Sequence, residues 1–335
     1  MMLSDALSAH RPLAVILGPT AVGKSRVAVE VARHFATEVL TADSRQVYRG
    51  MDIGTDKPTM EERAGVPHRL IDLVHPDQPF NAGRYREAAV LEADRLHAAR
   101  RLPLVVGGTG LYIRALVRGL CPAPPADLKL RTALLAIEPD RLYAELIRTD
   151  PESAARLHPH DRAKVIRAVE VHRLTGEPMS ALHRRHAFGE TRFTPLLIGL
   201  ARPTEQLYRR IEERIDWQLA HGMVEETRAL LDRGYGKESG AMTGLGYRQV
   251  AGYLAGEYDY GEMVQRFKRD TRHFAKRQMT WFRKEPGITW LPIEEDEHAL
   301  EGTASDVITL IDRFLASLEE SMPSGVMQQR RERSA

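Results

Sequence analysis

Cysteine is nearly absent from the chain, which has one, Cys121, in 335 residues. No intrachain disulfide can form, and a zinc site built from several cysteines is excluded. No apolar run approaches the roughly 20 residues that a transmembrane helix needs, and Met1–His10 lacks the basic-then-apolar order of a secretory signal. We expect a cytosolic protein that binds no membrane, and we take a monomer as the starting expectation.

An excess of one charge sign is also lacking. The chain has 48 Lys and Arg against 46 Asp and Glu, a formal net charge of +2. Net charge therefore points to no particular partner, and only local clusters of charge can do so. Hydrophobic residues make up 43 % of the chain and charged residues 28 %, which excludes a disordered or collagen-like chain. The length suffices for roughly two domains of about 150 residues each.

A glycine-rich loop follows the first apolar run, at residues 12–18. It reads Gly18-Pro19-Thr20-Ala21-Val22-Gly23-Lys24-Ser25, which fits the phosphate-binding pattern G-x-x-x-x-G-K-S/T between a strand and a helix. Converging backbone N–H groups, the helix N-terminus and Lys24 attract an anion, and the Ser25 hydroxyl can hold Mg²⁺. The loop predicts a site for a diphosphate or polyphosphate, and does not identify the ligand as ATP.

Further short apolar runs alternate with helical patterns in the first third of the chain. The pattern predicts strands at 38–42, 69–74 and 104–106 and a helix over 85–100. Strands that alternate with helices form a mainly parallel sheet that is covered on both faces. We therefore predict an α/β fold with a P-loop parallel-sheet core.

The pattern becomes purely helical after Cys121, and an apolar run returns at 195–200. The simplest interpretation is an all-helical insertion domain between two strands of one core. Beyond it, the sequence predicts a long helix with Leu207, Ile211, Ile215 and Leu219 in one stripe, a helix at 260–284, a strand at 287–292 and an amphipathic helix at 306–318. The predicted division is a catalytic core of 11–121 and 194–320, an insertion of 122–193 and a disordered tail of 321–335.

The chain lacks the carboxylate that nucleotide hydrolases place at the end of a later strand to hold Mg²⁺. Residues 104–106 run instead into Gly107-Gly108-Thr109, and the other candidate acids are Asp43 and Asp72. This weakens an ATPase interpretation. Thr109 can support a metal or a diphosphate from the same sheet edge, although Gly-Gly-Thr is also typical of a plain tight turn.

Asp43 lies at the carboxyl end of the second predicted strand, beside the phosphate loop. Its carboxylate can accept a proton from a substrate nucleophile, and the amide of the nearby Gln46 can bind a base edge. Taken alone, Asp43-Ser44 is more often a turn or a helix cap, and Gln46 is as readily a solvated side chain.

Three motifs together resemble the tRNA dimethylallyltransferases, which prenylate N6 of adenosine 37 beside the anticodon. They are the loop at 18–25, the run Asp43-Ser44-Arg45-Gln46-Val47-Tyr48 with its continuation to Thr55, and Gly107-Gly108-Thr109-Gly110-Leu111-Tyr112. The resemblance continues at 246–249 and 276–283, so that it covers roughly residues 12 to 290 in consistent order.

The resemblance implies Mg²⁺-dependent transfer of a dimethylallyl group from dimethylallyl diphosphate to tRNA. Residues 18–25 would hold the diphosphate leaving group, with Ser25 and Thr109 at the metal. Asp43 would be the general base, and Lys24 and Thr109 would complete the catalytic set. Arg214 is expected to be a second cation for the diphosphate.

The resemblance also implies that the anticodon stem-loop of tRNA is the partner of this chain. Residues expected to face it fall in five segments, namely Asp43, Ser44, Arg45 and Gln46 with Thr109; Arg131; Ala163, Lys164, Val165, Ile166 and Arg167; Met242, Thr243, Gly244, Leu245, Gly246 and Tyr247; and Lys276, Arg277, Gln278, Met279, Thr280, Trp281, Phe282 and Arg283.

A basic stripe is predicted on the helix at 260–284. It contains Arg266, Arg269, Arg272, Lys276 and Arg277, opposite Phe267, Phe274 and Trp281. The aromatic side chains are best interpreted as core anchors and the basic stripe as a phosphate track, with a plain solvated face as the alternative. Five histidines between 158 and 186 lack the spacing of a zinc site.

Two other functions stay open on the residues alone. One is a P-loop small-molecule kinase, against which the missing strand-end aspartate counts. The other is a noncatalytic RNA-binding switch driven by a nucleotide, which would not need Asp43 for its activity.

Overall fold

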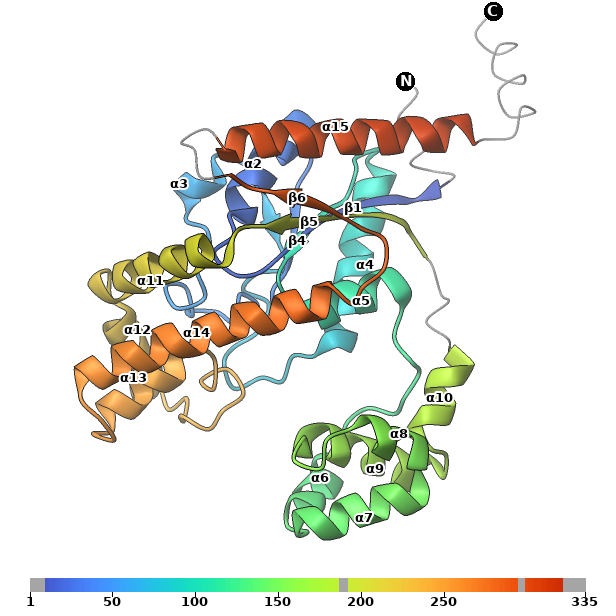
Figure 1. The fold of residues 1–335 in the computed structure, drawn as a ribbon, viewed down its shortest axis with the longest axis vertical. Coiled ribbons are helices and arrows are strands. Elements are labelled where there is room, and N and C mark those ends of the chain that lie inside the picture. Colours follow the sequence, from blue (N-terminus) through green and yellow to red (C-terminus); the bar gives the residue numbers. More distant parts are fainter. Residues whose placement is uncertain (1–9, 187–191, 295–298, 322–335) are drawn as a thin grey trace, which may run out of the picture. The chain divides into compact units, whose positions relative to one another are not determined.

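The computed structural model describes residues 10–186, 192–294 and 299–321 (Figure 1). The chain divides into two compact units. The core unit is Met1–Val117 with Phe193–Ala335, and the helical unit is Arg118–Arg192. These bounds fall close to the predicted division at 121/122 and 193/194, and nearly all of the predicted tail lies outside the described residues. Among the described helices, none combines the length and apolar character that crossing a membrane requires.

The described residues of the core unit form one six-stranded sheet in the order β3-β2-β4-β1-β5-β6. All of its strand pairs are parallel. The strands are β1 (Pro12–Leu17), β2 (Val39–Ala42), β3 (His68–Arg69), β4 (Leu104–Gly107), β5 (Thr194–Ala201) and β6 (Ile288–Pro292). The predicted parallel α/β architecture is confirmed.

Side chains of the fully buried strand β1 alternate between two apolar layers. Ala14 and Ile16 pack with α2 (Lys24–His34), α11 (Thr204–Ala220) and α15 (Ala299–Glu320). Leu13, Val15 and Leu17 pack with α4 (Ala82–Ala98) and α5 (Gly110–Arg118). Helices therefore cover both faces of the sheet, as a parallel sheet requires.

A third apolar cluster of the core unit surrounds residues 47–51. It is built by α12 (Met223–Asp232), α13 (Tyr247–Leu254) and the long helix α14 (Tyr260–Phe282), which contributes Met263. The short helix α3 (Met60–Arg63) lies between β2 and β3 in the chain. The stripe of α11 is buried at Leu207, Ile211 and Ile215, as its periodicity predicted.

The helical unit has its own apolar core, centred on Leu142, Leu146 and Val169. Its helices are α6 (Leu128–Leu135), α7 (Pro139–Thr149), α8 (Pro151–Arg156), α9 (Arg162–Thr175) and α10 (Met179–His186). Two of them, α7 and α8, begin at prolines, a position where the missing N–H costs nothing.

The third predicted strand was wrong beyond residue 69. Leu70 and Asp72 have φ values of 65° and 54°, in the left-handed region, which interrupts an extended chain. Only a bridge between Val74 and Tyr48 follows. The buried face of α4 contains Tyr85, Ala89, Ala93 and Leu96, whereas Leu91 is exposed.

A buried carboxylate closes the amino end of β2. Glu38, whose side chain is 5 % exposed, accepts hydrogen bonds from Arg69 (2.7 Å), Arg95 (2.6 Å) and Arg101 (2.9 Å). Burial by itself would raise the pKa of Glu38, but the bonds from Arg95 and Arg69 outweigh it and lower the pKa to about 2. The cluster joins β2 to β3, to α4 and to the connection before β4.

Replacing Glu38 by Gln should lower the free energy of unfolding at pH 7 by roughly 1–3 kcal/mol. The folded-state pKa lies below the ordinary value of 4.5, so this contribution is complete above that pH and is lost as the pH falls toward 2. Urea unfolding between pH 7 and pH 2.5 measures it, with Glu87→Gln on the exposed face of α4 as control. Equal pH slopes for Glu38→Gln and wild type would contradict it.

Candidate active site

The phosphate loop leaves β1 and enters α2 through two glycines that other residues could not replace. Gly18 has a φ of 151°, and a Cβ there would lie 2.6 Å from the carbonyl oxygen of Leu200. Gly23 caps α2 with a φ of 112°. The loop curls because both positions adopt backbone angles that side chains disfavour. Its amides thereby gather at the N-terminus of α2, where an anion is stabilised.

A cavity of about 480 Å³ lies beside this loop, at the carboxyl edge of the sheet. The residues expected at the diphosphate and at the proton transfer are among those that line it, notably Thr20, Ala21, Gly23, Lys24, Ser25, Asp43 and Gln46. Arg210, Glu213, Arg214 and Trp217 of α11 line it as well. Ligands of open α/β sheets bind at this edge.

Cations surround the loop from two directions. Lys24 donates from Nζ to the carbonyl of Pro19 at 2.7 Å. Burial lowers the pKa of Lys24 to about 8, a shift that the charge of Arg214 increases and those of Asp43 and Asp56 oppose. The negative charge of a diphosphate would favour the protonated amine.

Arg214, the residue expected to be a second cation for the diphosphate, reaches the loop from α11. Its Nη2 donates to Thr20 Oγ1 at 2.6 Å and its Nη1 to Asp56 at 2.8 Å. Arg210, one turn earlier, donates to the carbonyl of Ala21 at 3.0 Å. Sequence reasoning missed Arg210, although its i,i+4 spacing from Arg214 on one helix was a usable signal.

Asp43 both shapes a turn and lines the cavity. Its Oδ1 accepts from the backbone N–H of Arg45 (2.7 Å) and of Gln46 (3.3 Å), the pattern of an Asx turn. The turn interpretation and the catalytic interpretation of Asp43 are thus compatible, because a carboxylate has a second oxygen for chemistry.

Thr109 lies against the same turn. Its N–H donates to the carbonyl of Ala42 at 3.1 Å, and its Oγ1 accepts from the N–H of Ser44 at 3.0 Å. Because β2 and β4 are neighbours, the ends of these strands bring Asp43, Ser44 and Thr109 together.

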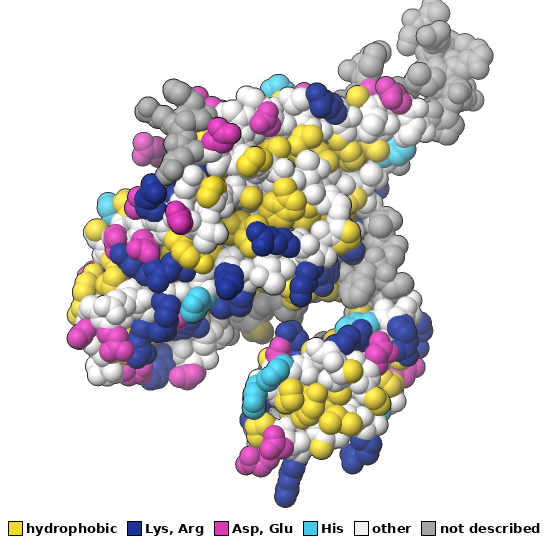
Figure 2. Space-filling model, viewed as in Figure 1, with side chains coloured by type: hydrophobic (Ala, Val, Ile, Leu, Met, Phe, Trp, Pro, Cys, Tyr) yellow, Lys and Arg dark blue, Asp and Glu magenta, His cyan; other side chains and the backbone are white. Residues whose placement is uncertain are grey.

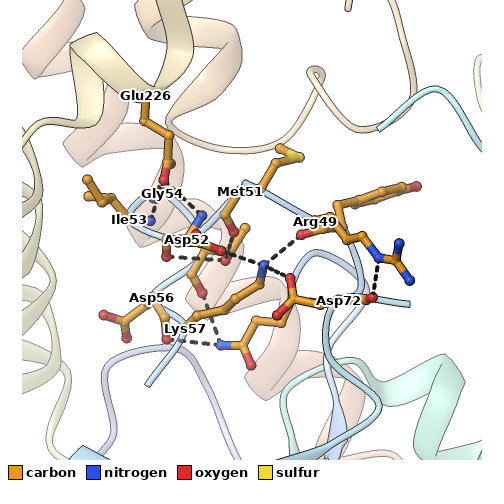
Figure 3. Close-up of polar contacts among 12 residues, drawn as sticks. Arg49, Met51, Asp52, Ile53, Gly54, Asp56, Lys57, Asp72 and Glu226 are labelled. Atoms are coloured by element: carbon orange, nitrogen blue, oxygen red, sulfur yellow. Dashed lines mark hydrogen bonds and ion pairs between the residues drawn. The ribbon is translucent and has the colours of Figure 1, made fainter. Parts of the chain in front are cut away.

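Thr55 and Asp56 of a loop at 51–57 line the cavity, and Figure 3 shows the polar contacts that hold this loop. Gln46 donates from Nε2 to the carbonyls of Thr55 (3.1 Å) and Asp56 (3.0 Å). Lys57, with a side chain 4 % exposed, donates to Asp52 at 2.7 Å and to Asp72 at 2.6 Å. The side chain of Gln46 thus binds the loop through its amide nitrogen, and it also lines the cavity.

Glu226 of α12 binds the same loop from the other side (Figure 3). Its carboxylate accepts from three successive N–H groups, those of Asp52 (2.9 Å), Ile53 (2.9 Å) and Gly54 (3.1 Å), and from the hydroxyl of Tyr247 (2.6 Å). Burial, together with the charge of Glu226, raises the pKa of Tyr247 and keeps its donor proton in place. No local sequence pattern indicated this contact.

The expected tRNA-facing residues of α14 divide between surface and core. Lys276, Arg277, Thr280 and Arg283 are exposed, Met279 and Trp281 are half-buried, and Gln278 and Phe282 are buried. A groove of about 400 Å³ is lined by His273, Lys276, Arg277, Thr280, Trp281 and Lys284. Figure 2 shows Lys and Arg side chains along α14. Of the predicted aromatic anchors, Phe267 is fully buried and Phe274 partly so.

The basic stripe of α14 is not uniform. Arg266, Arg269 and Arg272 each form an ion pair, with Glu262, Asp270 and Glu212 respectively. Among the described residues, none forms an ion pair with Lys276, Arg277 or Lys284. The cations of this stripe that lack an ion pair among the described residues are therefore at the C-terminal end of the helix.

The expected segment at 242–247 is largely internal. Met242 and Tyr247 are buried in the cluster around 47–51, Gly244 and Gly246 are buried and Leu245 is half-buried, whereas Thr243 is exposed. Arg45 donates to the carbonyl of Gly240 at 2.6 Å, so the residues just before this segment support the turn that follows Asp43.

In the helical unit, Arg131 and Arg167 both donate to Glu170, which is fully buried. Val165 and Ile166 pack in the unit's apolar core, so their side chains are not available at its surface. Ala163 and Lys164 are exposed. Of the five expected residues at 163–167, only these two present their side chains fully to solvent.

The oxygen atoms around the phosphate loop suit Mg²⁺. Ser25 and Thr109 offer hydroxyls and Asp43 a carboxylate, all of them hard donors. Within the described ranges, no group of three or more His, Cys, Asp or Glu side chains could hold a metal ion. A small donor set of this kind fits Mg²⁺, which binds few protein ligands and completes its shell with phosphate oxygens and water.

Comparison with known proteins gives the family. The model of the family described as IPP transferase matches residues 46–285, and that described as isopentenyl transferase matches residues 12–77. The chain belongs to the IPP transferase family. The predicted resemblance is thereby confirmed over the region that contains the phosphate loop, Asp43 and Thr109.

Named IPP transferase relatives match nearly full length. A tRNA dimethylallyltransferase 2 of Geotalea uraniireducens is 46 % identical over 287 residues, which is 84 % of this chain and 93 % of that protein. The tRNA isopentenylpyrophosphate transferase of Bacillus halodurans has a similar structure, with a TM-score of 0.70 and 35 % identity over 92 % of this chain and 98 % of that one. A eukaryotic dimethylallyltransferase acting on tRNA matches with a TM-score of 0.81 and 26 % identity, over 91 % of this chain and 80 % of that one.

Replacing Glu226 by Gln should lower the free energy of unfolding by about 2 kcal/mol, because an amide cannot accept from three N–H groups and a hydroxyl as a carboxylate does. Urea unfolding measures the loss, and limited proteolysis within 50–57 reports loosening of the loop. Glu225→Gln, at the exposed neighbouring position, is the matched control. Identical stability and cleavage for the two variants would show that the contact has no role.

Proposed function

We propose that this chain transfers a dimethylallyl group from dimethylallyl diphosphate to N6 of adenosine 37 in tRNA, releasing diphosphate. The observation that carries the proposal is a cavity at the sheet edge that is lined by the phosphate loop and Asp43. Thr109 binds the turn beside Asp43 through the N–H of Ser44. An anion site beside a carboxylate and a hydroxyl suits departure of a diphosphate and removal of a proton from the nucleophile. The names of the matched relatives support the same reaction.

The leaving group would be bound by the amides of 18–25, by Lys24 and by Arg214. As the bond between carbon and oxygen breaks, negative charge grows on the diphosphate, and preorganised donors stabilise that charge most strongly in the transition state. Mg²⁺ held by Ser25 and Thr109 would supply further neutralisation of the diphosphate when bound.

The nucleophile would be the exocyclic amine of adenine. Its lone pair is delocalised into the ring, so it attacks only when the allylic carbon has become strongly electrophilic. Asp43 would remove the proton as the bond between carbon and nitrogen forms. A base in an RNA loop must be unstacked to reach the cavity, which costs a few kcal/mol.

The anticodon stem-loop would compensate this cost by contacts to its phosphates. The exposed cations at the end of α14, Lys276, Arg277 and Lys284, are suited to them, and we assign Ala163 and Lys164 of the helical unit to RNA contact on the resemblance. The working state of the enzyme is taken as a monomer.

A direct assay distinguishes the proposed reaction from the kinase alternative. The chain is incubated with an anticodon stem-loop, Mg²⁺ and either dimethylallyl diphosphate or ATP, and the RNA is weighed by mass spectrometry. A dimethylallyl group added to the RNA with the first donor alone supports the proposal. A phosphoryl group transferred from ATP, or no modification with either donor, would reject it.

Replacing Asp43 by Asn should slow single-turnover transfer by a factor on the order of 10² to 10⁴. The Asn side-chain oxygen can still accept from the N–H groups of Arg45 and Gln46, so the turn and the tRNA affinity should be retained. Rapid-quench assays with saturating tRNA measure the rate, and a filter-binding assay serves as the control. A rate close to wild type would remove Asp43 from the proton transfer.

Replacing Lys276 and Arg277 together by Ala should weaken tRNA binding and reduce the slope of log affinity against log salt by roughly 1.5 to 2, if each contacts one phosphate. The pair Arg266 and Arg269, whose charges are compensated within the protein, is the matched control and should change the slope less. Binding titrations from 50 to 300 mM salt measure both. A salt-independent loss would indicate misfolding instead.

A further inference from the structure

Helix α14 packs directly against the glycine turn that follows β4. A Cβ at Gly108 would lie 2.4 Å from Gln278 Nε2, and a Cβ at Gly110 would lie 2.2 Å from Trp281 Nε1. Neither glycine is among the residues with positive φ, so backbone freedom does not explain them. They are small because the side chains of α14 occupy the space that any larger residue would need.

The amide of Gln278 spans two loops of the site. Its Oε1 accepts from the N–H of Thr20 at 2.9 Å, and its Nε2 donates to the carbonyl of Gly108 at 2.8 Å. Gln278 is 8 % exposed, so both bonds form in a largely buried environment, where losing a partner is costly.

The two anchor points lie next to the groups that act on the diphosphate. Thr20 belongs to the phosphate loop, and its hydroxyl accepts a hydrogen bond from Arg214. Gly108 precedes Thr109, whose hydroxyl oxygen accepts a hydrogen bond from the N–H of Ser44. One side chain therefore fixes the separation between the anion-binding loop and the turn that contains Thr109.

We propose that Gln278 is a positioning residue that sets the phosphate loop against the Thr109 turn for binding and departure of the diphosphate. The inference rests on the proposed function and adds a role within it. It also replaces the expectation that Gln278 faces tRNA, because its side chain points into the protein while the neighbouring Lys276 and Arg277 are exposed. Helix α14 would thus present cations to RNA on one side and hold the donor site on the other.

The first test replaces Gln278 by Met, which keeps nearly the same volume and removes both hydrogen bonds. We expect kcat/KM for dimethylallyl diphosphate to fall by a factor on the order of 10 to 100, with the tRNA dissociation constant within about twofold of wild type. The matched control is Gln265→Met, an exposed glutamine on the same helix, which should change neither quantity. Thermal unfolding verifies that the variants are folded, and should Gln278→Met not fold, Gln278→Glu replaces it, keeping the acceptor for Thr20.

The second test displaces the same amide from the opposite side. Gly108→Ala places a methyl group 2.4 Å from Gln278 Nε2 and 3.3 Å from the carbonyl oxygen of Gly18. Adding Gln278→Ala removes the closer of these two contacts. If both single variants act through this contact, the double variant should be no slower than the Gln278→Ala single variant. Multiplicative losses in the double variant would show that the two residues act independently and would overturn the proposal.

The failure of this proposal differs from failure of the proposed function. Wild-type chain that adds no dimethylallyl group to the stem-loop rejects the function itself. Active wild type with Gln278→Met equal to Gln265→Met rejects the positioning role alone. A loss confined to tRNA affinity, with the donor kinetics unchanged, would instead make Gln278 an RNA contact.

Discussion

Parallel pairing of β1 and β2 with β4 is the constraint on which the rest of the site depends. Because the three strands run in the same direction, the phosphate loop, Asp43 and Thr109 follow their ends at one edge of the sheet. Residues that are more than 60 positions apart in the chain, such as Ser44 and Thr109, are thereby within hydrogen-bond distance. The parallel sheet brings the loops to one edge, and the loops provide the chemical groups.

Loops alone would not hold these groups in place, and three side chains from later helices do so. Arg214 of α11 joins Thr20 to Asp56, Glu226 of α12 binds the amides of 52–54, and Gln278 of α14 joins Thr20 to Gly108. Arg214 lines the cavity, whereas Glu226 and Gln278 bind the loops that surround it. The second half of the core unit thus acts as a rigid backing for the loops of the first half.

Local sequence patterns predicted the parts of the site that are formed by residues adjacent in the chain. The phosphate loop, the Asp43 turn and the parallel α/β character of the core fall in this class, because glycine spacing and apolar runs report local backbone structure. Sequence analysis did not predict the observed roles of Gln278, Glu226 and Lys57. Their contacts are either remote in the chain or buried, and such contacts leave no local sequence pattern. The third strand was predicted too long because an apolar run cannot reveal the left-handed angles at Leu70 and Asp72.

The three amides at 52–54 form a second concave receptor for negative charge, of the kind that oriented N–H groups create elsewhere in proteins. The carboxylate of Glu226, a side chain of the protein itself, occupies this receptor and accepts hydrogen bonds from all three N–H groups. Because Glu226 already binds these three N–H groups, they are not available to a second anion.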